Sequence, residues 1–428
     1  MKKLILSASS IGAFKSCPIR FRNAYVYGIR PIEDKESQRV GTNWHLLLET
    51  AALVPGNECS CVHPGPVLPL IKEDCPICEG IGMVPDDIME VVTRVLNKAY
   101  EGIEFNDPEA KEVERVTLLH ALAGYRWHYG EQLEPVVATE QYFSLPLLNP
   151  QTGHPVPDVF IKGRIDKLIE IANGIAVKEH KSTSKSIDSD STYWGHLNLD
   201  VQTTMYIYAA RRMQQNEIPC EHPGCLNHLS HPCENCGKGG PLINTVKYDV
   251  YHKPTIRPKK LTQGDSKKFV ADGMYCGQEF EVVTGIPEPG YTELLHPAVN
   301  GVQAYLEPGS KPGTFTIRET PDMFGARLLK DITERPEFYF RCVELTRTDA
   351  ELKAFEQELY DIAQNMQFMV RSGRFYTNEH QCEATFRCDY IESCYNRQIV
   401  DPDHIPDGFK CIFAERFRRE KLDDIMQS

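Results

Sequence analysis

The chain has 428 residues, 41% of them hydrophobic and 25% charged, which is enough to bury a sizeable core in one elaborated domain or two. Sixty acidic residues against 47 Lys and Arg give a net charge of −13, a balance that disfavours a protein that coats DNA non-specifically. No apolar run approaches the roughly 20 residues of a membrane helix. The apolar run near the start is too short for a signal peptide, so we expect a cytoplasmic protein with no membrane partner.

The first part of the chain is predicted to be mainly helical. Ser7 or Ser9 can N-cap a short helix, which Pro18 then interrupts or restarts. The pattern next predicts a helix at 41–52, two helices within 86–129 and a strand at 136–148. His45 lies near the start of the first of these helices, where a histidine taken alone is typical of a partly buried packing position.

Residues 160–181 (FIKGRIDKLIEIANGIAVKEHK) predict a β-hairpin, because two apolar runs flank a turn of Ala, Asn and Gly. Asp166 lies in the first run. Glu179 and Lys181 lie two positions apart in the second, so both point to one face of the strand. Two carboxylates can hold Mg²⁺ or Mn²⁺, and a lysine beside the cation can position or deprotonate a water. An amphipathic hairpin with solvated charges is the alternative.

The remainder of the chain predicts a helix at 192–215, a strand at 244–253, a loop-rich stretch at 285–324 and a helix at 348–371. On the first of these helices, Gln202 and Tyr206 are four positions apart and share a face. Residues 257–268 form the densest positive run of the chain. This run is a solvated loop or, beside a metal site, a track for phosphates.

Fifteen cysteines in a chain without a signal peptide indicate metal ligands rather than disulfide bonds. Two groups lie in islands rich in Pro and Gly, and their members are Cys59, Cys61, Cys75, Cys78 and Cys220, Cys225, Cys233, Cys236. Their paired spacing is typical of knuckles that supply four thiolates, so we predict up to two structural Zn²⁺ sites, with reduced metal-free loops as the alternative. A third group combines the early Cys17 with Cys382, Cys388 and Cys394.

Six stretches occur in a recognisable order and span residues 5–395: LSASSIGAFKSCPIRF, GTNWHLLLE, GRIDKLIE, VKEHKST, DVQTTMY and CDYIESC. In this order they resemble the PD-(D/E)XK nuclease superfamily, and within it the RecB-type exonucleases that hold an iron–sulfur cluster, such as AddB-like proteins, CRISPR adaptation nucleases and stand-alone phage proteins. The resemblance implies an α/β fold with a restriction-endonuclease-like core, in which helices flank a small mixed sheet. It also implies N- and C-terminal helical parts that an iron–sulfur cluster staples together. The two cysteine-rich islands are then insertions into this fold.

The resemblance implies roles for the residues of the hairpin. Asp166, Glu179 and His45 correspond to metal ligands, with the backbone carbonyl of His180 nearby. An imidazole among the ligands favours Mn²⁺ over Mg²⁺. Lys181 corresponds to the catalytic lysine of the family.

Two further motifs follow from the resemblance. Gln202 and Tyr206 match the QxxxY motif, which supports the active site and contacts DNA. Cys17 and the three late cysteines match the four ligands of a 4Fe–4S cluster. Five residues separate Cys382 from Cys388 where much of the family has two, so zinc at these four thiolates is the alternative.

We expect six segments along the chain. They are an N-terminal helical part (1–54), a zinc-type insertion (55–85), a nuclease core (86–215), a second zinc-type insertion (216–240), a core continuation with helices (241–380) and a cluster-binding segment with a tail (381–428).

The expected function is a metal-dependent DNA exonuclease that acts on ends or single strands in phage or bacterial replication, recombination or repair, with a helicase or recombination partner. The alternatives are a CRISPR-type end trimmer or structure-specific endonuclease, and a non-catalytic DNA-binding scaffold. The intact Asp166, Glu179 and Lys181 argue against the scaffold.

Overall fold

The computed structural model describes residues 3–32, 35–63, 70–105, 107–172, 174–217, 242–283, 297–308, 311, 314–384 and 387–413. The second cysteine island lies outside these residues, so a zinc site at Cys220, Cys225, Cys233 and Cys236 stays a prediction. Among the described helices, none combines the length and the apolar composition that crossing a membrane requires.

A mixed six-stranded sheet forms the centre of the described structure. Its strands are β1 (Leu4–Leu6), β3 (Val136–Leu148), β4 (Pro155–Ile171), β5 (Gly174–Thr183), β6 (Thr245–His252) and β14 (Phe340–Thr346). The long strand β4 pairs antiparallel with β3 along one edge, so β1 and β5 must share its other edge. β6 then runs parallel to β5, and β14 runs antiparallel to β6. The predicted hairpin is confirmed as β4 and β5.

The sheet opens along one edge of β4. Pairing with β1 ends at Ile161 and pairing with β5 begins at Lys167, so the described residues 162–166 pair with neither strand. Asp166 is the last residue of this opening. A carboxylate there has room for partners that do not belong to the sheet.

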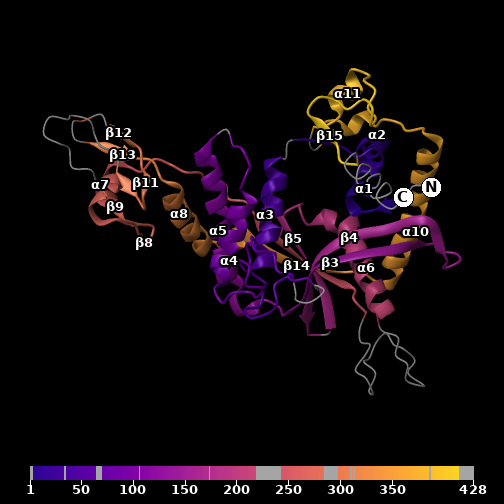
Figure 1. Ribbon diagram of the computed structural model, residues 1–428, viewed down its shortest axis with the longest axis horizontal. Coiled ribbons are helices and arrows are strands. Elements are labelled where there is room, and N and C mark those ends of the chain that lie inside the picture. Colours follow the sequence, from indigo (N-terminus) through magenta and orange to yellow (C-terminus); the bar gives the residue numbers. More distant parts are fainter. Residues whose placement is uncertain are drawn as a thin grey trace, which may run out of the picture.

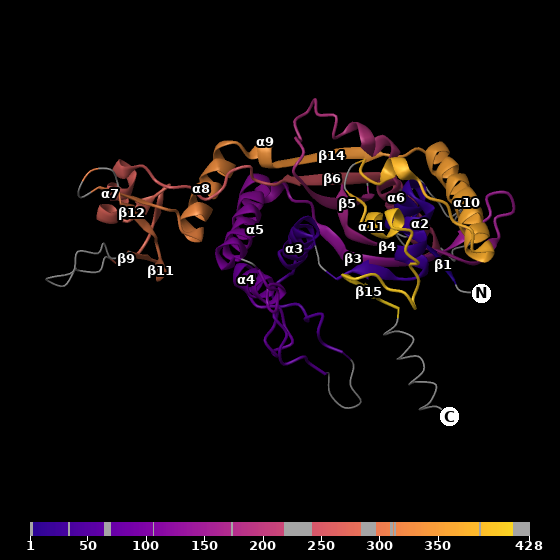
Figure 2. The ribbon, with the colours of Figure 1, turned by 90° about the horizontal axis from the view of Figure 1, so that it is seen from above.

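Helices cover both faces of the sheet (Figures 1 and 2). One core packs the sheet against α1 (Ala8–Ser16), α6 (Val201–Glu217) and α10 (Asp349–Ser372). A second core joins β6 and β14 to α3 (Glu36–Thr50), α4 (Ile88–Ala99), α5 (Pro108–Tyr129) and α8 (Pro321–Glu334). Ser7 and Thr348 cap α1 and α10 through capping boxes, as their sequences predict.

Two distant parts of the chain form a small lobe beside α1, which we call the terminal lobe (residues 17–31 and 379–411). Its elements are α2 (Pro18–Phe21), a π-helical turn (Arg22–Val26), β2 (Ile29–Pro31), a 3₁₀ turn (Glu379–Gln381), α11 (Ile391–Tyr395) and β15 (Phe409–Cys411). β2 pairs antiparallel with β15, and Ile29, Tyr390 and Val400 share a core beneath them. Figure 1 shows the yellow C-terminal elements lying against indigo α2.

A second projection, the arm (residues 259–320), extends beyond α8 at the opposite end of the molecule (Figure 1). It contains α7 (Gln263–Asp272) and the short strands β7 (Met274–Tyr275), β8 (Gln278–Glu279), β9 (Val282–Val283), β10 (Ala298–Val299), β11 (Val302–Gln303), β12 (Leu306–Pro308) and β13 (Phe315–Ile317). Its own core includes Leu261, Phe269 and Phe280. The second half of the basic run, residues 263–268, is therefore helical, and the run lies away from β4 and β5 (Figure 1).

Some element boundaries differ from those predicted. The helix expected at 192–215 begins only at Val201, after a 3₁₀ turn (Gly195–Leu199), because the Asp200 side chain accepts from Thr203 N–H and caps it there. Strand β14 was not predicted. The remaining short elements are α9 (Pro336–Tyr339) and a 3₁₀ turn after α5 (Gly130–Gln132).

Candidate active site and cysteine centres

The hairpin brings Asp166 and Glu179 together at the opening of the sheet. Lys167 of β4 pairs with Lys178 of β5, so Asp166 and Glu179 are the next residues across the same two antiparallel strands. Lys181 lies two positions further along β5, on the same face as Glu179. The three residues therefore share one rim, as the sequence pattern predicts.

Two groups converge on one oxygen of Asp166. Nδ1 of His45, which α3 carries over the hairpin, lies 3.2 Å from Asp166 Oδ2. The backbone N–H of His180 donates to the same oxygen over 2.8 Å. The structure thus brings His45 to the carboxylate, where it can serve either as a hydrogen-bond partner or as a ligand beside Asp166.

Glu179 is fully buried, and only one of its oxygens is satisfied among the described residues. Its Oε1 accepts from Gln202 Nε2 over 2.8 Å and from Lys181 Nζ. Gln202 Nε2 also donates to Tyr206 Oη over 3.0 Å, so the QxxxY pair of α6 holds this carboxylate. Oε2 is buried with no hydrogen-bond partner in the described structure. An orphaned carboxylate oxygen beside Asp166 fits a hard divalent cation.

The electrostatics of the site separate the two carboxylates. Burial opposes ionisation of Asp166, but the hydrogen bond and charge of His45 outweigh it and lower its pKa to about 2. Burial raises the pKa of Glu179 to about 7, against the opposing charge of Lys181. For Lys181, burial is outweighed by Glu179 and Asp166, and its pKa rises. Lys181 is therefore a protonated donor at neutral pH.

The similarity of this chain to a known family covers the whole arrangement of sheet, histidine, carboxylates and lysine. A model of the PD-(D/E)XK nuclease superfamily matches residues 5–395, nearly the whole chain. The chain belongs to this superfamily. Its central mixed sheet with flanking helices is the restriction-endonuclease-like fold of that family. No curated protein matches the chain.

Membership of the PD-(D/E)XK nuclease superfamily indicates a metal-dependent nuclease, a hydrolase that uses Mg²⁺ or Mn²⁺ and for which DNA is the implied substrate. Asp166, Glu179 and Lys181 lie together on one rim of the hairpin. The donor set of the site agrees with this chemistry, since oxygen ligands suit both cations.

Behind the PD-(D/E)XK hairpin lies a buried charge network that sequence reasoning missed. The His180 ring is buried, with Nδ1 at 3.3 Å from Asp249 Oδ2, and burial lowers its pKa to about 4. Asp249 also accepts from Tyr125 Oη over 2.5 Å. Because Tyr125 and Asp249 are 124 residues apart, no local pattern could have paired them. The network anchors the strand that carries Glu179 and Lys181.

A second set of charges flanks Asp166 on the exposed side. Glu140, in a backbone conformation with φ of 49°, lies between the pairs Thr139–Lys167 and Gln141–Ile165, and so faces Asp166 across β3 and β4. Its carboxylate forms an ion pair with Arg164. Burial raises the pKa of Glu140, against the opposing charge of Arg164. Its positive φ can be seen only in the fold.

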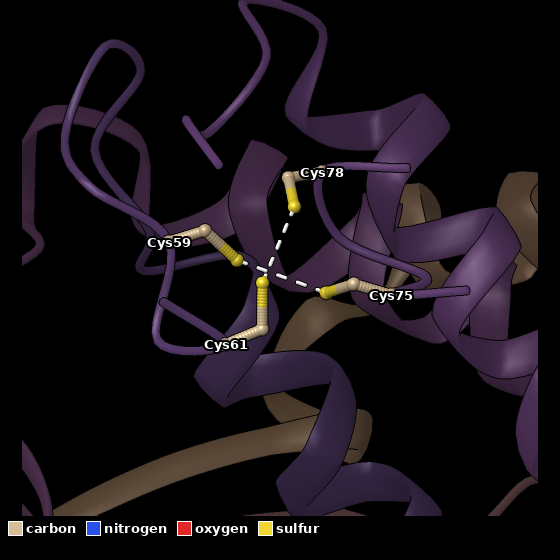
Figure 3. A group of neighbouring side chains, drawn as sticks. All are labelled: Cys59, Cys61, Cys75 and Cys78. Atoms are coloured by element: carbon tan, nitrogen blue, oxygen red, sulfur yellow. Dashed lines mark hydrogen bonds between the residues drawn. The ribbon is translucent and has the colours of Figure 1, made fainter. Parts of the chain in front are cut away.

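The first cysteine island forms a compact four-thiol centre (Figure 3). The sulfurs of Cys59, Cys61, Cys75 and Cys78 all lie within 4.8 Å of one another. Cys59 Sγ lies 3.7 Å from Cys75 Sγ, and Cys61 Sγ lies 3.4 Å from Cys78 Sγ. A zinc ion with Zn–S bonds of about 2.3 Å separates tetrahedral sulfurs by about 3.8 Å. The four thiols therefore fit one metal ion.

The backbone around this centre favours a thiolate at Cys78 and fixes the island to the core, whereas burial raises the pKa of Cys59 to about 12 and also raises that of Cys61. Burial opposes ionisation of Cys78, but the backbone N–H of Gly82, Cys61 and the N–H of Gly80 outweigh it and lower the thiol pKa to about 7. Arg94 of α4 donates to the backbone carbonyls of Pro76 and Ile77 over 3.3 and 3.1 Å. The connection between α3 and α4 is thus held at a defined position.

The third cysteine group meets in the terminal lobe. Cys17, Cys382, Cys388 and Cys394 line one cavity of about 180 Å³. Burial raises the pKa of the thiols of Cys382, Cys388 and Cys394, and the neighbouring thiols raise it further. Unlike the first island, these sulfurs do not all lie within 4.8 Å of one another.

Proposed function

We propose that this protein is a metal-dependent DNA exonuclease that hydrolyses phosphodiester bonds at ends or in single strands, as RecB-type enzymes of replication, recombination or repair do. The observation that supports it most is the convergence of His45, Asp166, Glu179 and Lys181 on one opening of the sheet. The two carboxylates suit a hard cation, the imidazole favours Mn²⁺ over Mg²⁺, and Lys181 adds a partly buried ammonium. A non-catalytic scaffold would not need this set.

The residues divide the work of hydrolysis. His45, Asp166 and Glu179 would hold the cation, with the backbone carbonyl of His180 nearby. When bound, Mg²⁺ or Mn²⁺ would supply a lowered pKa for a water and neutralisation of charge on the phosphate. Lys181, which its neighbours keep protonated, donates a hydrogen bond to the reacting water or phosphate and offsets negative charge in the transition state. Positioning by Lys181 is favoured over proton abstraction, because a lysine with a raised pKa is a poor base.

The remaining motifs support this centre. Gln202 and Tyr206 hold Glu179 in place. We assign a 4Fe–4S cluster to Cys17 and the three late cysteines, since their cavity is wider than a single ion needs. We assign Zn²⁺ to the compact centre of Cys59, Cys61, Cys75 and Cys78, because its sulfur spacing matches a tetrahedral ion. Both groups stabilise the fold and take no part in hydrolysis.

The test is incubation of anaerobically purified protein with end-labelled single- and double-stranded DNA in Mn²⁺, with free and blocked ends. We expect mononucleotides or short products from free ends. Lys181→Ala should reduce the rate by a factor of about 10²–10³, because the loss of one donor to transition-state charge costs about that much.

The matched control is Lys185→Ala, which changes an exposed lysine four positions along the same segment. It should cut at the parental rate. Parental cleavage by Lys181→Ala would show that the active-site assignment is wrong, whereas equal cleavage of free and blocked ends would leave the nuclease but replace exonuclease with endonuclease.

A further inference from the structure

A second cavity, which we call the basic cavity, lies between the nuclease core and the terminal lobe. It has a volume of about 560 Å³ and draws its lining from α1, α2, β2, the start of α3, and β15. Four cationic side chains line it, and they are Arg20, Arg30, Lys35 and Lys410. In a chain with 13 more acidic than basic residues, this local surplus of positive charge requires an explanation.

The cations of the basic cavity are largely uncompensated. Arg30 of β2 and Lys410 of β15 are directly paired in the antiparallel register, an arrangement that is destabilising for like charges. Within the described residues, neither of them forms an ion pair, and neither does Arg20. Lys35 is paired with Asp389, which is the acidic residue in the described lining. Three of these four cations lack an acidic partner among the described residues, and a cluster of this kind is suited to a polyanion.

Other groups in the lining suit a nucleic acid strand. The Arg30 guanidinium lies 4.3 Å from the centre of the Tyr25 ring, which also lines the cavity. Gln38 adds an exposed amide. Tyr25, which also stacks on Phe21, therefore holds the Arg30 guanidinium in the cavity. A positively charged groove is typical of proteins that track the backbone of a single strand.

The basic cavity is connected to the active site by α3. Lys35 and Gln38 lie at the start of this helix, and His45 lies on the same helix further along. From Glu36 to His45 the helix rises about 14 Å, at about 1.5 Å per residue. A few nucleotides of extended strand can span that distance.

We propose that the basic cavity binds the backbone of single-stranded DNA and leads its end along α3 to the metal centre. The proposal rests on the proposed nuclease function and specifies the substrate of that site. The volume falls within the range of about 300–1,000 Å³ of small-molecule pockets, which admits a nucleotide or two. A duplex, whose major groove alone is about 12 Å wide, does not fit.

The proposal can be tested by fluorescence anisotropy with a labelled single-stranded oligonucleotide in EDTA, so that no cleavage occurs. Arg30→Glu combined with Lys410→Glu should weaken binding at least tenfold. For each phosphate that the protein then fails to neutralise, the slope of log affinity against log salt should also become shallower by about 0.7. The matched control is Lys267→Glu combined with Lys268→Glu, the same change in net charge on exposed lysines of the arm.

Unchanged affinity of the Arg30→Glu, Lys410→Glu protein, or an equal loss in the arm control, would overturn the proposal. The proposal would also be overturned if duplex DNA bound the parent as tightly as single-stranded DNA and its affinity fell as much in the Arg30→Glu, Lys410→Glu protein. If the double variant has a lowered melting temperature, Lys410→Glu alone replaces it in the binding test, because Lys410 lies at an exposed position. Wild-type hydrolysis of bis(4-nitrophenyl) phosphate in Mn²⁺ tests the nuclease itself, so failure there is distinguishable from failure of the cavity.

Discussion

At the scale of single residues, His45 shows how little one side chain reveals by itself. On its helix it has the pattern of a half-buried packing residue, and only the order of motifs around it suggests a ligand. In the structure its Nδ1 approaches Asp166 Oδ2, and the hydrogen bond and charge of Asp166 raise the His45 pKa against the effect of burial. The same geometry allows a neutral imidazole to donate its lone pair to a cation beside Asp166.

His45→Ala should raise the Mn²⁺ concentration needed for half-maximal cleavage by at least about tenfold, since even the outer partners of metal ligands contribute about 10–100-fold in affinity. A titration of activity against Mn²⁺ measures this shift. His154→Ala, which removes an exposed histidine in the turn between β3 and β4, is the control and should leave the curve unchanged. Superimposable curves for parent and His45→Ala would return His45 to a packing role.

Local spacing was sufficient to predict that Asp166, Glu179 and Lys181 share a rim, because strand periodicity and a hairpin turn fix their relative positions. Asp249 and Glu140 could not be found in that way. Asp249 reaches the site through the parallel pairing of β5 with β6, and Glu140 through an irregularity of β3. Both positions depend on tertiary strand pairing, which the sequence around each residue does not indicate.

At the scale of elements, the cysteine island is the connecting segment between α3 and α4, and it is held in a fixed position. Its four sulfurs replace a hydrophobic core that so short a segment cannot build, and Arg94 ties its loop to α4. The island connects α3, which carries His45, to α4, and both helices pack in the second core. Its contribution to function is therefore indirect.

Cys75→Ser combined with Cys78→Ser should release about one zinc per chain and lower the melting temperature, because metal binding contributes to folding free energy. Elemental analysis and thermal unfolding measure the two effects. Arg94→Ala is the matched variant, since it loosens the docking without removing a ligand, and it should keep its zinc. A parent protein without zinc would contradict the assignment.

The charge network at the base of β5 makes a second element-scale prediction. Burial opposes ionisation of Glu134, but hydrogen bonds from Lys178 and Lys247 outweigh it and lower its pKa from 4.5 to about 2. A folded-state pKa below the unfolded value stabilises the protein fully above pH 4.5, and this is lost as the pH falls towards 2. Glu134→Gln should lower the free energy of unfolding by about 2 kcal/mol at pH 7. In urea titrations the deficit should shrink below pH 4.5, and a constant deficit would contradict the account.

The predicted elements were most accurate where one face is apolar and a cap is present. The strands at 136–148 and 244–253 and the helix at 348–371 are confirmed to within a residue at each end. Helix α7 was not predicted, because Phe269 is its one fully buried apolar residue and the exposed Lys267 and Lys268 precede it directly. Such short elements are specified by the core of the arm and not by their own periodicity.

At the scale of the whole molecule, the order of six motifs carried the fold class, since family membership reaches from residue 5 to residue 395. The arm and the basic cavity have no such motif. They arise where segments far apart in sequence meet, as β2 and β15 do. Overall composition did not predict the basic cavity for the same reason, because a chain with a net negative charge can still gather four cationic side chains around one cavity.

Cys388→Ser should bleach the brown colour that a 4Fe–4S cluster gives, with loss of the broad absorption near about 400 nm. It should also lower the melting temperature, because the four cysteines hold the two ends of the fold together. Cys411→Ser is the control: this thiol donates to the Tyr27 carbonyl in the same lobe but lies outside the four. Colourless anaerobic protein with zinc and no iron would replace the cluster by zinc and leave the fold unaffected.

The pairing of β2 with β15 also sets an order of events during synthesis. Ile29 leaves the ribosome about 380 residues before Cys411, its partner in the antiparallel register. At about 5–20 residues per second, the early strand waits on the order of 20–80 s for them. Cys17 waits nearly as long for its companion thiols. The terminal lobe is thus the last part to close, so a nascent chain exposes an unpaired strand edge and the Cys17 thiol until synthesis is nearly complete.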